Sequence, residues 1–224
     1  MLIPIPEVLT KTELETIQSR LAGAAWEDGR ATAGHQSARV KHNLQLPENG
    51  AEARELGEIV LKALGRSALF MTAALPRAVF PPLFNKYEQG MSFGAHVDNA
   101  IRPLPGSPRS IRTDLSATLF LNDDYDGGEL LIDDAAGARS AKLPAGSMIL
   151  YPATTLHRVA PVTRGARLAA FFWVQSMVKD EGERRLLFDL DRAIVELGRV
   201  APDHPSVARL TGVYHNLVRK WGEV

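Results

Sequence analysis

His96 and Asp98 are two potential metal ligands that are separated by one residue, Val97. On an extended strand, residues i and i+2 project from the same face, so both side chains could reach one ion. Such a triplet alone more often decorates a surface loop. His157 offers a third ligand, although a lone histidine on an apolar strand is usually a core residue. Two imidazoles and one carboxylate together form the ligand set that holds non-haem Fe(II) and leaves coordination positions open.

Arg167 stands at the head of the apolar segment Leu168–Val174. If Thr163-Arg164-Gly165 is the turn of a hairpin, Arg167 pairs near Pro161. It then lies about four strand residues from His157, roughly 13 Å at about 3.3 Å per residue. An extended arginine and a five-carbon diacid can span that gap, and a guanidinium binds a carboxylate bidentately. The alternative interpretation of Arg167 is an outward-facing surface arginine.

The segments that would position these residues are short, apolar and separated by turn residues. Between residues 79 and 177, Gly, Pro, Asn and Asp clusters such as 122–128 and 144–146 divide the chain. Many short strands with regular turn signals predict a sandwich or a closed, barrel-like sheet. The expected strands are Pro81–Tyr87, Leu115–Leu121, Glu129–Ile132, Met148–Tyr151, Leu156–Val162 and Arg167–Met177.

Both ends of the chain carry helical patterns. Thr10 and Glu13 have the spacing of a capping box ahead of a first helix. We expect further helices over 51–64 and 67–74 in the first part of the chain. In the last part, Asp180 and Ser206 are candidate caps of two more helices. The chain therefore divides into a helical flank over 1–78, a β core over 79–177 and a helical region over 178–224, an α+β organisation.

The β core carries a series of motifs in a fixed order. They are Tyr87-x-x-Gly90-x-x-Phe93-x-x-His96-x-Asp98, the segment Asp114–Asp123, Gly127-Gly128-Glu129-Leu130, Gly146-Ser147-Met148, His157-Arg158-Val159 and Arg167. The order and spacing of these motifs are more specific than any one of them, and they resemble those of Fe(II)/2-oxoglutarate dioxygenases of the prolyl-4-hydroxylase-like type. With the helical flanks and the chain length, the resemblance extends to the bacterial PKHD-type hydroxylases.

The resemblance implies a double-stranded β-helix, or jelly-roll, core with the metal near one open end. It implies that His96, Asp98 and His157 hold Fe(II), while Arg167 binds the distal carboxylate of 2-oxoglutarate. The Tyr87 hydroxyl would help Arg167, or Tyr87 is an ordinary aromatic core residue.

The same resemblance gives structural roles to other residues. Leu119 and Phe171 would be apolar pocket walls, Gly127-Gly128 a tight turn into a strand, and Asn122 and Asp123 turn residues.

The implied reaction consumes 2-oxoglutarate and O₂, releases succinate and CO₂, and hydroxylates a peptidyl residue or a small molecule such as an iron chelator. Ascorbate is implied as a reductant for the iron. Two other classes remain open. A cupin-type metal enzyme would more often show an HxH ligand pair and would not need Arg167. A non-enzymatic sensor would bind iron and 2-oxoglutarate without substrate-stimulated succinate release.

The composition of the chain excludes several kinds of chemistry and several classes of binding partner. The 224 residues include 26 Lys+Arg, 26 Asp+Glu, six histidines and no cysteine. Without cysteine, disulfides, thiol nucleophiles and iron–sulfur ligation are excluded. Zero net charge argues against broad nucleic-acid binding, because no charge excess neutralises phosphates. The N-terminus lacks a secretory pattern and the longest apolar run, Leu168–Val174, is too short for a bilayer, so we expect a cytoplasmic protein without a membrane span.

The segment Asn99–Arg112 follows the first two ligands and is rich in proline and arginine. We interpret it as a mobile loop. One hypothesis makes it a lid whose Arg102, Arg109 and Arg112 contact an acidic or chelating substrate, and the alternative is a solvated basic loop. The helical flanks leave a homo-oligomer open. The remaining histidines show no ligand spacing with one another: His35, His42, His204 and His215.

Overall fold

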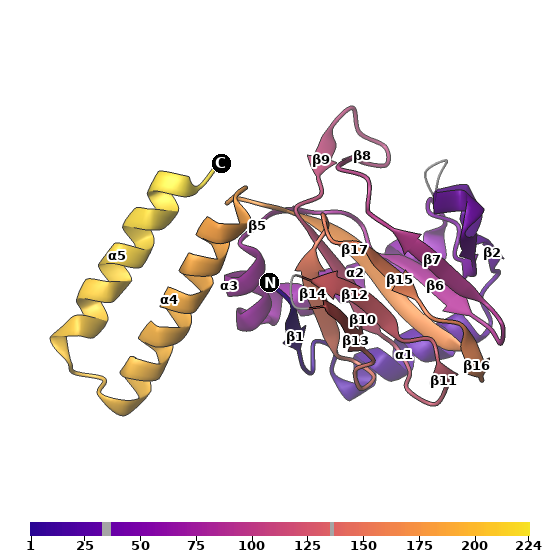
Figure 1. Ribbon diagram of the computed structural model, residues 1–224. Coiled ribbons are helices and arrows are strands. Elements are labelled where there is room, and N and C mark those ends of the chain that lie inside the picture. The colour runs from indigo at the N-terminus through magenta and orange to yellow at the C-terminus, as the bar shows by residue number, and fades with distance from the viewer. Residues whose placement is uncertain (33–36, 135–136) are drawn as a thin grey trace.

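Two antiparallel sheets face each other in a computed structural model that describes residues 1–32, 37–134 and 137–224 (Figure 1). The larger sheet has the strand order β1-β14-β10-β17-β6-β4-β2, with β5 pairing β17 beside it. The smaller sheet has the order β13-β12-β15-β7-β3. Two short pairs, β11 with β16 and β8 with β9, complete the β structure of the described residues.

The strands are short, as the turn-rich sequence predicts. Their bounds are β1 Ile3–Ile5, β2 Glu27–Asp28, β3 Lys41–His42, β4 Leu44–Gln45, β5 Pro76–Val79, β6 Leu83–Tyr87, β7 Ser92–His96, β8 Ile101–Pro103, β9 Ser110–Arg112, β10 Leu115–Phe120, β11 Asp126–Gly127, β12 Leu130–Asp134, β13 Gly137–Ala141, β14 Met148–Pro152, β15 His157–Val159, β16 Val162–Arg164 and β17 Arg167–Ser176.

The helices lie in the two flanks: α1 Lys11–Ala22, α2 Ala51–Arg66, α3 Ala68–Ala74, α4 Glu181–Val200 and α5 Pro205–Trp221, with short 3₁₀ turns at Gly29–Thr32 and Ser37–Arg39. Thr10 forms the predicted capping box with Glu13, and Asp180 caps α4 by accepting a hydrogen bond from the Glu183 backbone N–H. The prediction of Ser206 as a cap is wrong, because His204 caps α5 and accepts from the Ser206 N–H.

The main core lies between the first three helices and the outer face of the larger sheet. Ile17 of α1, Leu56 of α2 and Phe70 of α3 are buried in one cluster with strand residues such as Leu119 and Val174. The inner face of that sheet looks toward the smaller sheet. In Figure 1, α4 and α5 form a helical pair to the left of the sheets, and α4 contacts α3.

The first flank is less helical than the sequence pattern suggests. β1 pairs β14, β2 and β4 extend the larger sheet beyond β6, and β3 pairs β7 of the smaller sheet. Strands of two or three residues carry too few alternating positions to be recognised from sequence, and long-range pairing decides them.

The predicted hairpin between Pro161 and Arg167 is wrong. β16 pairs β11, whereas β17 crosses to the larger sheet, where Arg167 is opposite Tyr87. The segment Asn99–Arg112 also differs from the expected loop, because β8 and β9 form a two-stranded hairpin within it. Both differences arise because the strand partners are distant in sequence and the local turn signals do not identify them.

Within the described ranges, none of the helices combines the length and the apolar composition that crossing a bilayer would require.

Candidate functional site

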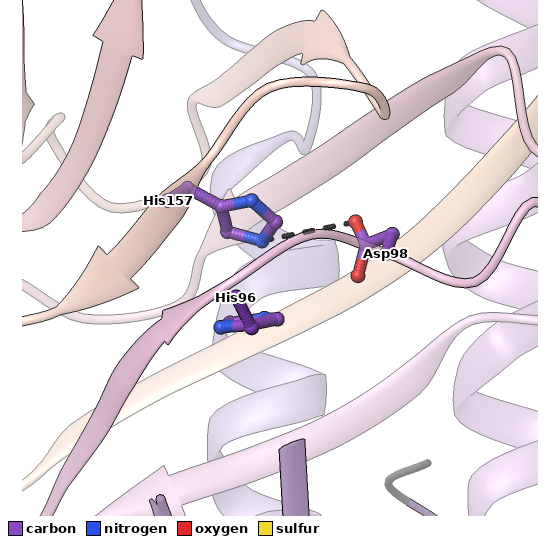
Figure 2. Close-up of side chains that lie close together, drawn as sticks. All are labelled: His96, Asp98 and His157. Carbon is purple, nitrogen blue, oxygen red and sulfur yellow. Dashed lines mark ion pairs between the residues drawn. The ribbon is translucent and has the colours of Figure 1, made fainter. Parts of the chain in front are cut away.

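His96, Asp98 and His157 converge on one point between the sheets. A donor atom from each residue lies within 4.8 Å of the other two. His96 ends β7, Asp98 follows two residues later, and His157 opens β15 directly opposite His96. Figure 2 shows the three side chains pointing toward one another. The structure thus brings together the three residues that the sequence analysis predicts as metal ligands.

The ring orientations leave one nitrogen of each histidine available to a metal. His96 Nδ1 lies 2.8 Å from the Gly94 carbonyl oxygen, and His157 Nδ1 lies 2.9 Å from that of Thr155. A carbonyl only accepts hydrogen bonds, so in a neutral ring Nδ1 carries the proton and Nε2 keeps its lone pair. Such a bond through the other nitrogen is typical of metal-binding histidines.

The His96 ring is held neutral and in place. Burial, with His157 as a second cause, lowers the pKa of His96 to about 4. Phe93 stacks on the His96 ring with 3.6 Å between the centroids, which fixes the ring plane. A neutral, oriented imidazole is the form that binds a metal.

Asp98 is oriented by a hydroxyl group that the sequence interpretation did not single out. Ser116 Oγ, on β10, donates to Asp98 Oδ2 at 2.6 Å, and His157 Nε2 lies 3.7 Å from the same oxygen (Figure 2). The signal for Ser116 was weak, because a serine in an apolar strand has no distinctive spacing. Two imidazole nitrogens and one oriented carboxylate fit the donor set of a non-haem Fe(II) site.

Arg167 lies in the same cavity with an unusual environment. Only 1 % of the residue is exposed, and among the described residues its Nε and Nη1 have no hydrogen-bond partner. The guanidinium carbon lies 5.3 Å from the ring centroids of Tyr87 and Phe120. A buried cation with two nitrogens that lack hydrogen-bond acceptors is costly, so the geometry favours an anionic ligand in front of it.

Tyr87 is fully enclosed beside that guanidinium. Burial raises the pKa of Tyr87 to about 12, so its hydroxyl remains protonated at neutral pH and can donate a hydrogen bond.

Two turn residues hold Arg167 in position. Asn122 donates to the Ala166 carbonyl at 2.7 Å and accepts from the Leu168 N–H at 2.8 Å, so it fixes the backbone on both sides of Arg167. Gly128 has φ +66°, and a Cβ there would lie 3.2 Å from Arg167 Cδ. Asn122 and Gly128 are therefore more than turn residues, because both determine the position of Arg167.

One cavity is lined by all five predicted site residues and by Phe171, as expected. The prediction of Leu119 as a pocket wall is wrong. Leu119 lies on the opposite face of β10 and packs with the helices in the main core, because neighbouring strand residues alternate between faces. The cavity also includes Lys41, Tyr151 and Trp173, which the sequence interpretation missed. Side chains two residues apart on a strand share a face, so the alternation from Arg167 through Phe171 is the sequence signal that also predicts Trp173 in the cavity.

The three arginines of the Asn99–Arg112 segment have different surroundings. Arg102 lines the cavity, Arg109 is exposed on the hairpin, and Arg112 binds Asp114 at 2.7 Å and Glu223 at 3.2 Å. Only Arg102 therefore stands where a substrate could contact it.

The remaining histidines do not extend the site. His42, His204 and His215 are exposed, while His35 lies outside the described residues. Within the described part of the chain, His96, Asp98 and His157 form the one group of three or more ligating side chains close enough to share an ion.

Comparison with known families gives two matches that follow each other along the chain. Residues 82–175 match the model of the 2OG-Fe(II) oxygenase superfamily. Residues 181–223 match the PKHD-type hydroxylase C-terminal domain.

Curated relatives are similar over the entire length. A PKHD-type hydroxylase of Saccharophagus degradans is 58 % identical over 225 residues, and one of Bordetella pertussis is 57 % identical over 226 residues. In both cases the alignment covers 100 % of each chain.

Solved structures with low identity share the fold. A Pseudomonas putida prolyl-4-hydroxylase has a TM-score of 0.53 at 17 % identity, covering 78 % of this chain and 92 % of its own. HygX from Streptomyces hygroscopicus, solved with nickel, 2-oxoglutarate and hygromycin B bound, has a TM-score of 0.54 at 12 % identity, covering 78 % and 82 %. The predicted jelly-roll core with helical flanks is confirmed.

Proposed function

Because the chain belongs to the PKHD-type hydroxylase family and is a 2-oxoglutarate- and Fe(II)-dependent dioxygenase, we propose that His96, Asp98 and His157 hold its Fe(II). We further propose that Arg167 binds the distal carboxylate of 2-oxoglutarate with help from the Tyr87 hydroxyl. The cosubstrates of the family are 2-oxoglutarate and O₂, and ascorbate is proposed as a reductant.

One observation carries the assignment. The buried Arg167 guanidinium, with Nε and Nη1 lacking protein partners, lines the same cavity as the three candidate ligands. A guanidinium binds a carboxylate through two parallel hydrogen bonds, and the protonated Tyr87 hydroxyl can add a third donor.

When bound, Fe(II) would use O₂ and 2-oxoglutarate to insert oxygen into a substrate C–H bond, with succinate and CO₂ as the other products. The chain's own residues position the reactants. The two imidazoles and the carboxylate would hold the metal, Arg167 would orient the diacid, and the apolar walls of the cavity would exclude water.

The accepting substrate is proposed to be a peptidyl residue or a small molecule such as an iron chelator. Family membership favours this oxidoreductase over the non-enzymatic sensor and the cupin-type enzyme, and the ligand pair is HxD rather than the HxH expected of a cupin. A cytoplasmic location and a homo-oligomer stay predictions.

An anaerobic titration tests the site. Fe(II) and 2-oxoglutarate added together should give a weak visible charge-transfer band with the unmodified protein. Asp98→Ala should lose the band, because it removes the only anionic ligand of the triad. Asp203→Ala, which changes an exposed aspartate, should keep it. A missing band in the unmodified protein, or a band that survives in Asp98→Ala, would refute the assignment.

A further inference from the structure

The cavity extends past the metal ligands to a second pair of cations. Lys41 and Arg102 both line it, at residues distant in the sequence. Lys41 comes from β3, where it pairs with Phe93 of β7, and Arg102 comes from β8 of the hairpin. We call this part of the cavity, walled by Lys41, Arg102, Phe171 and Trp173, the cationic subsite.

Position along β17 separates this subsite from Arg167. Arg167, Phe171 and Trp173 lie on the inner face of β17, as the first, fifth and seventh residues of that strand. The first and last of them are six residues apart, which corresponds to roughly 20 Å at about 3.3 Å per residue. One diacid on Arg167 therefore does not reach the Trp173 end, and a second molecule is needed to fill it.

Arg102 is held by aromatic rings with part of its polar edge unused. Its guanidinium carbon lies 4.1 Å from the Trp173 ring centroid and 4.9 Å from that of Phe80. The side chain is only 13 % exposed, and among the described residues its Nε has no hydrogen-bond partner. A guanidinium that stacks through its face keeps its N–H edge for a planar anion.

Lys41 places a second positive charge close to the first. Its ammonium lies 5.5 Å from the Phe93 ring centroid and 5.8 Å from that of Phe171, and it donates to Gln45 Oε1 at 3.1 Å. Burial, with Arg102 as the second cause, lowers the pKa of Lys41 to about 8. Lys41 is therefore still mostly charged at pH 7, and two neighbouring cations are kept at some cost in a buried cavity.

Charge balance indicates what these cations are for. With the proposed cofactors bound, Fe(II) and Arg167 supply as much positive charge as Asp98 and 2-oxoglutarate supply negative charge. Lys41 and Arg102 add two further positive charges. Asp28, Asp98 and Glu48 attract Lys41, and Glu48 lies 4.0 Å from Arg102, but neither Asp28 nor Glu48 lines the cavity.

We infer that the hydroxylated substrate is an anion, whose carboxylate or phosphate group binds Arg102 and Lys41 while its apolar body packs on Phe171 and Trp173. This inference rests on the proposed function, since the charge balance assumes Fe(II) and 2-oxoglutarate in the site. The anion anchors the substrate at one end and leaves its C–H bonds facing the metal ligands.

Three matched probes test the inference: phenylacetate, phenyl phosphate and the neutral phenylacetamide. Their affinities are measured by saturation-transfer NMR with 2-oxoglutarate saturating, so that Arg167 is engaged. At least one anion should bind ten-fold or more tightly than the amide, and the stronger anion identifies the preferred group. Equal binding of all three probes to the unmodified protein would overturn the inference.

Variants locate the preference within the cavity. Arg102→Gln and Lys41→Met should each reduce the preference for the anion at least five-fold, and Arg102→Lys should restore part of it. Arg109→Gln changes an exposed arginine of the same hairpin and should leave the preference unchanged. A preference that persists in the Arg102→Gln, Lys41→Met double variant, or an anion that further 2-oxoglutarate displaces, would contradict the subsite.

The two proposals fail in different ways. The anaerobic charge-transfer band reports binding of Fe(II) and 2-oxoglutarate. The NMR experiment reports the relative affinities of the anionic and neutral probes, and its readout does not depend on that band. A normal band with no anion preference refutes the cationic subsite alone, and a missing band refutes the proposed function.

Discussion

The chemistry of this protein depends on a few side chains whose charges are exposed to little water. Arg167 is the clearest, because its guanidinium is buried without protein acceptors for Nε and Nη1. A buried charge without partners destabilises the ligand-free protein, and it therefore favours the state in which a dicarboxylate is bound.

Arg167→Gln should therefore weaken 2-oxoglutarate binding on the order of 10- to 100-fold, since hydrogen bonds to charged groups contribute about 1.5–3 kcal/mol. Isothermal titration of 2-oxoglutarate into the metal-loaded protein measures this. Arg164→Gln is the control, because Arg164 is exposed and pairs with Asp126. Equal 2-oxoglutarate affinities for Arg167→Gln and the unmodified protein would refute the proposed role of Arg167 in binding the cosubstrate.

Ser116 is a second prediction at this scale. Its hydroxyl donates to Asp98 Oδ2, so Ser116→Ala should free the carboxylate to rotate and lower Fe(II) affinity about 10- to 100-fold, the usual cost of losing an outer partner of a metal ligand. A competition titration with a metal-binding dye gives the affinity. Ser147→Ala is the control, at a buried serine whose hydroxyl oxygen accepts a hydrogen bond from the Glu7 N–H, and it should have little effect on Fe(II) affinity. An equally large loss of affinity in Ser147→Ala would show a general effect on folding.

At the scale of elements, the start of β17 is fixed by the loop that precedes β12. Asn122 holds the backbone around Arg167, and Gly128 lets Val162, Tyr125 and the Arg167 side chain approach closely. The contacts that Asn122 and Gly128 make at this turn therefore also constrain ligand binding at Arg167.

Gly128→Ala and Gly106→Ala separate the effect of backbone strain on stability from the effect of side-chain crowding on ligand binding. The glycines have φ +66° and +69°, so each alanine should cost about 1–2 kcal/mol of stability through backbone strain. Only Gly128→Ala should also weaken 2-oxoglutarate binding, because Gly106 has no atom within 4 Å of the added Cβ. Denaturant unfolding and ligand titration measure both quantities, and similar 2-oxoglutarate affinities in the two variants would contradict the role of Gly128.

At the scale of the whole molecule, the C-terminal helices are joined to the core by a small cluster. Leu187 of α4 is fully buried with Leu75 and Val178, and Arg184 donates to the Val178 carbonyl at 2.7 Å. Arg112 links the β8–β9 hairpin to Glu223 near the C-terminus. The helical pair is therefore attached to the same end of the core as the hairpin that carries Arg102.

Leu187→Ala should lower the free energy of unfolding by about 2–5 kcal/mol, because it leaves a cavity at this junction. Its neighbour Leu186 is 60 % exposed, so Leu186→Ala should change stability by less than about 0.5 kcal/mol. Urea unfolding of both variants is the measurement. Similar stabilities for the two would mean that this cluster does not hold α4 on the core.

The sequence by itself determined the candidate ligand triad, the candidate carboxylate-binding arginine and the alternation of short strands and helical flanks. The His96-x-Asp98 spacing and the strand and helix periodicities are local features that the chain carries without reference to its fold, whereas His157 and Arg167 are identified by the order of the motifs along the chain. The Thr10 capping box and the Asp180 cap are local in the same sense.

Only the tertiary structure decided which strands pair. It placed Arg167 opposite Tyr87 rather than near Pro161, turned Leu119 to the helices, and brought Lys41 and Arg102 into the cavity. A strand's partner, and therefore the face that each side chain occupies, is selected by the packing of distant segments. The candidate metal ligands can be recognised from motifs along the chain, whereas the residues proposed to select the substrate come together only when the two sheets pack.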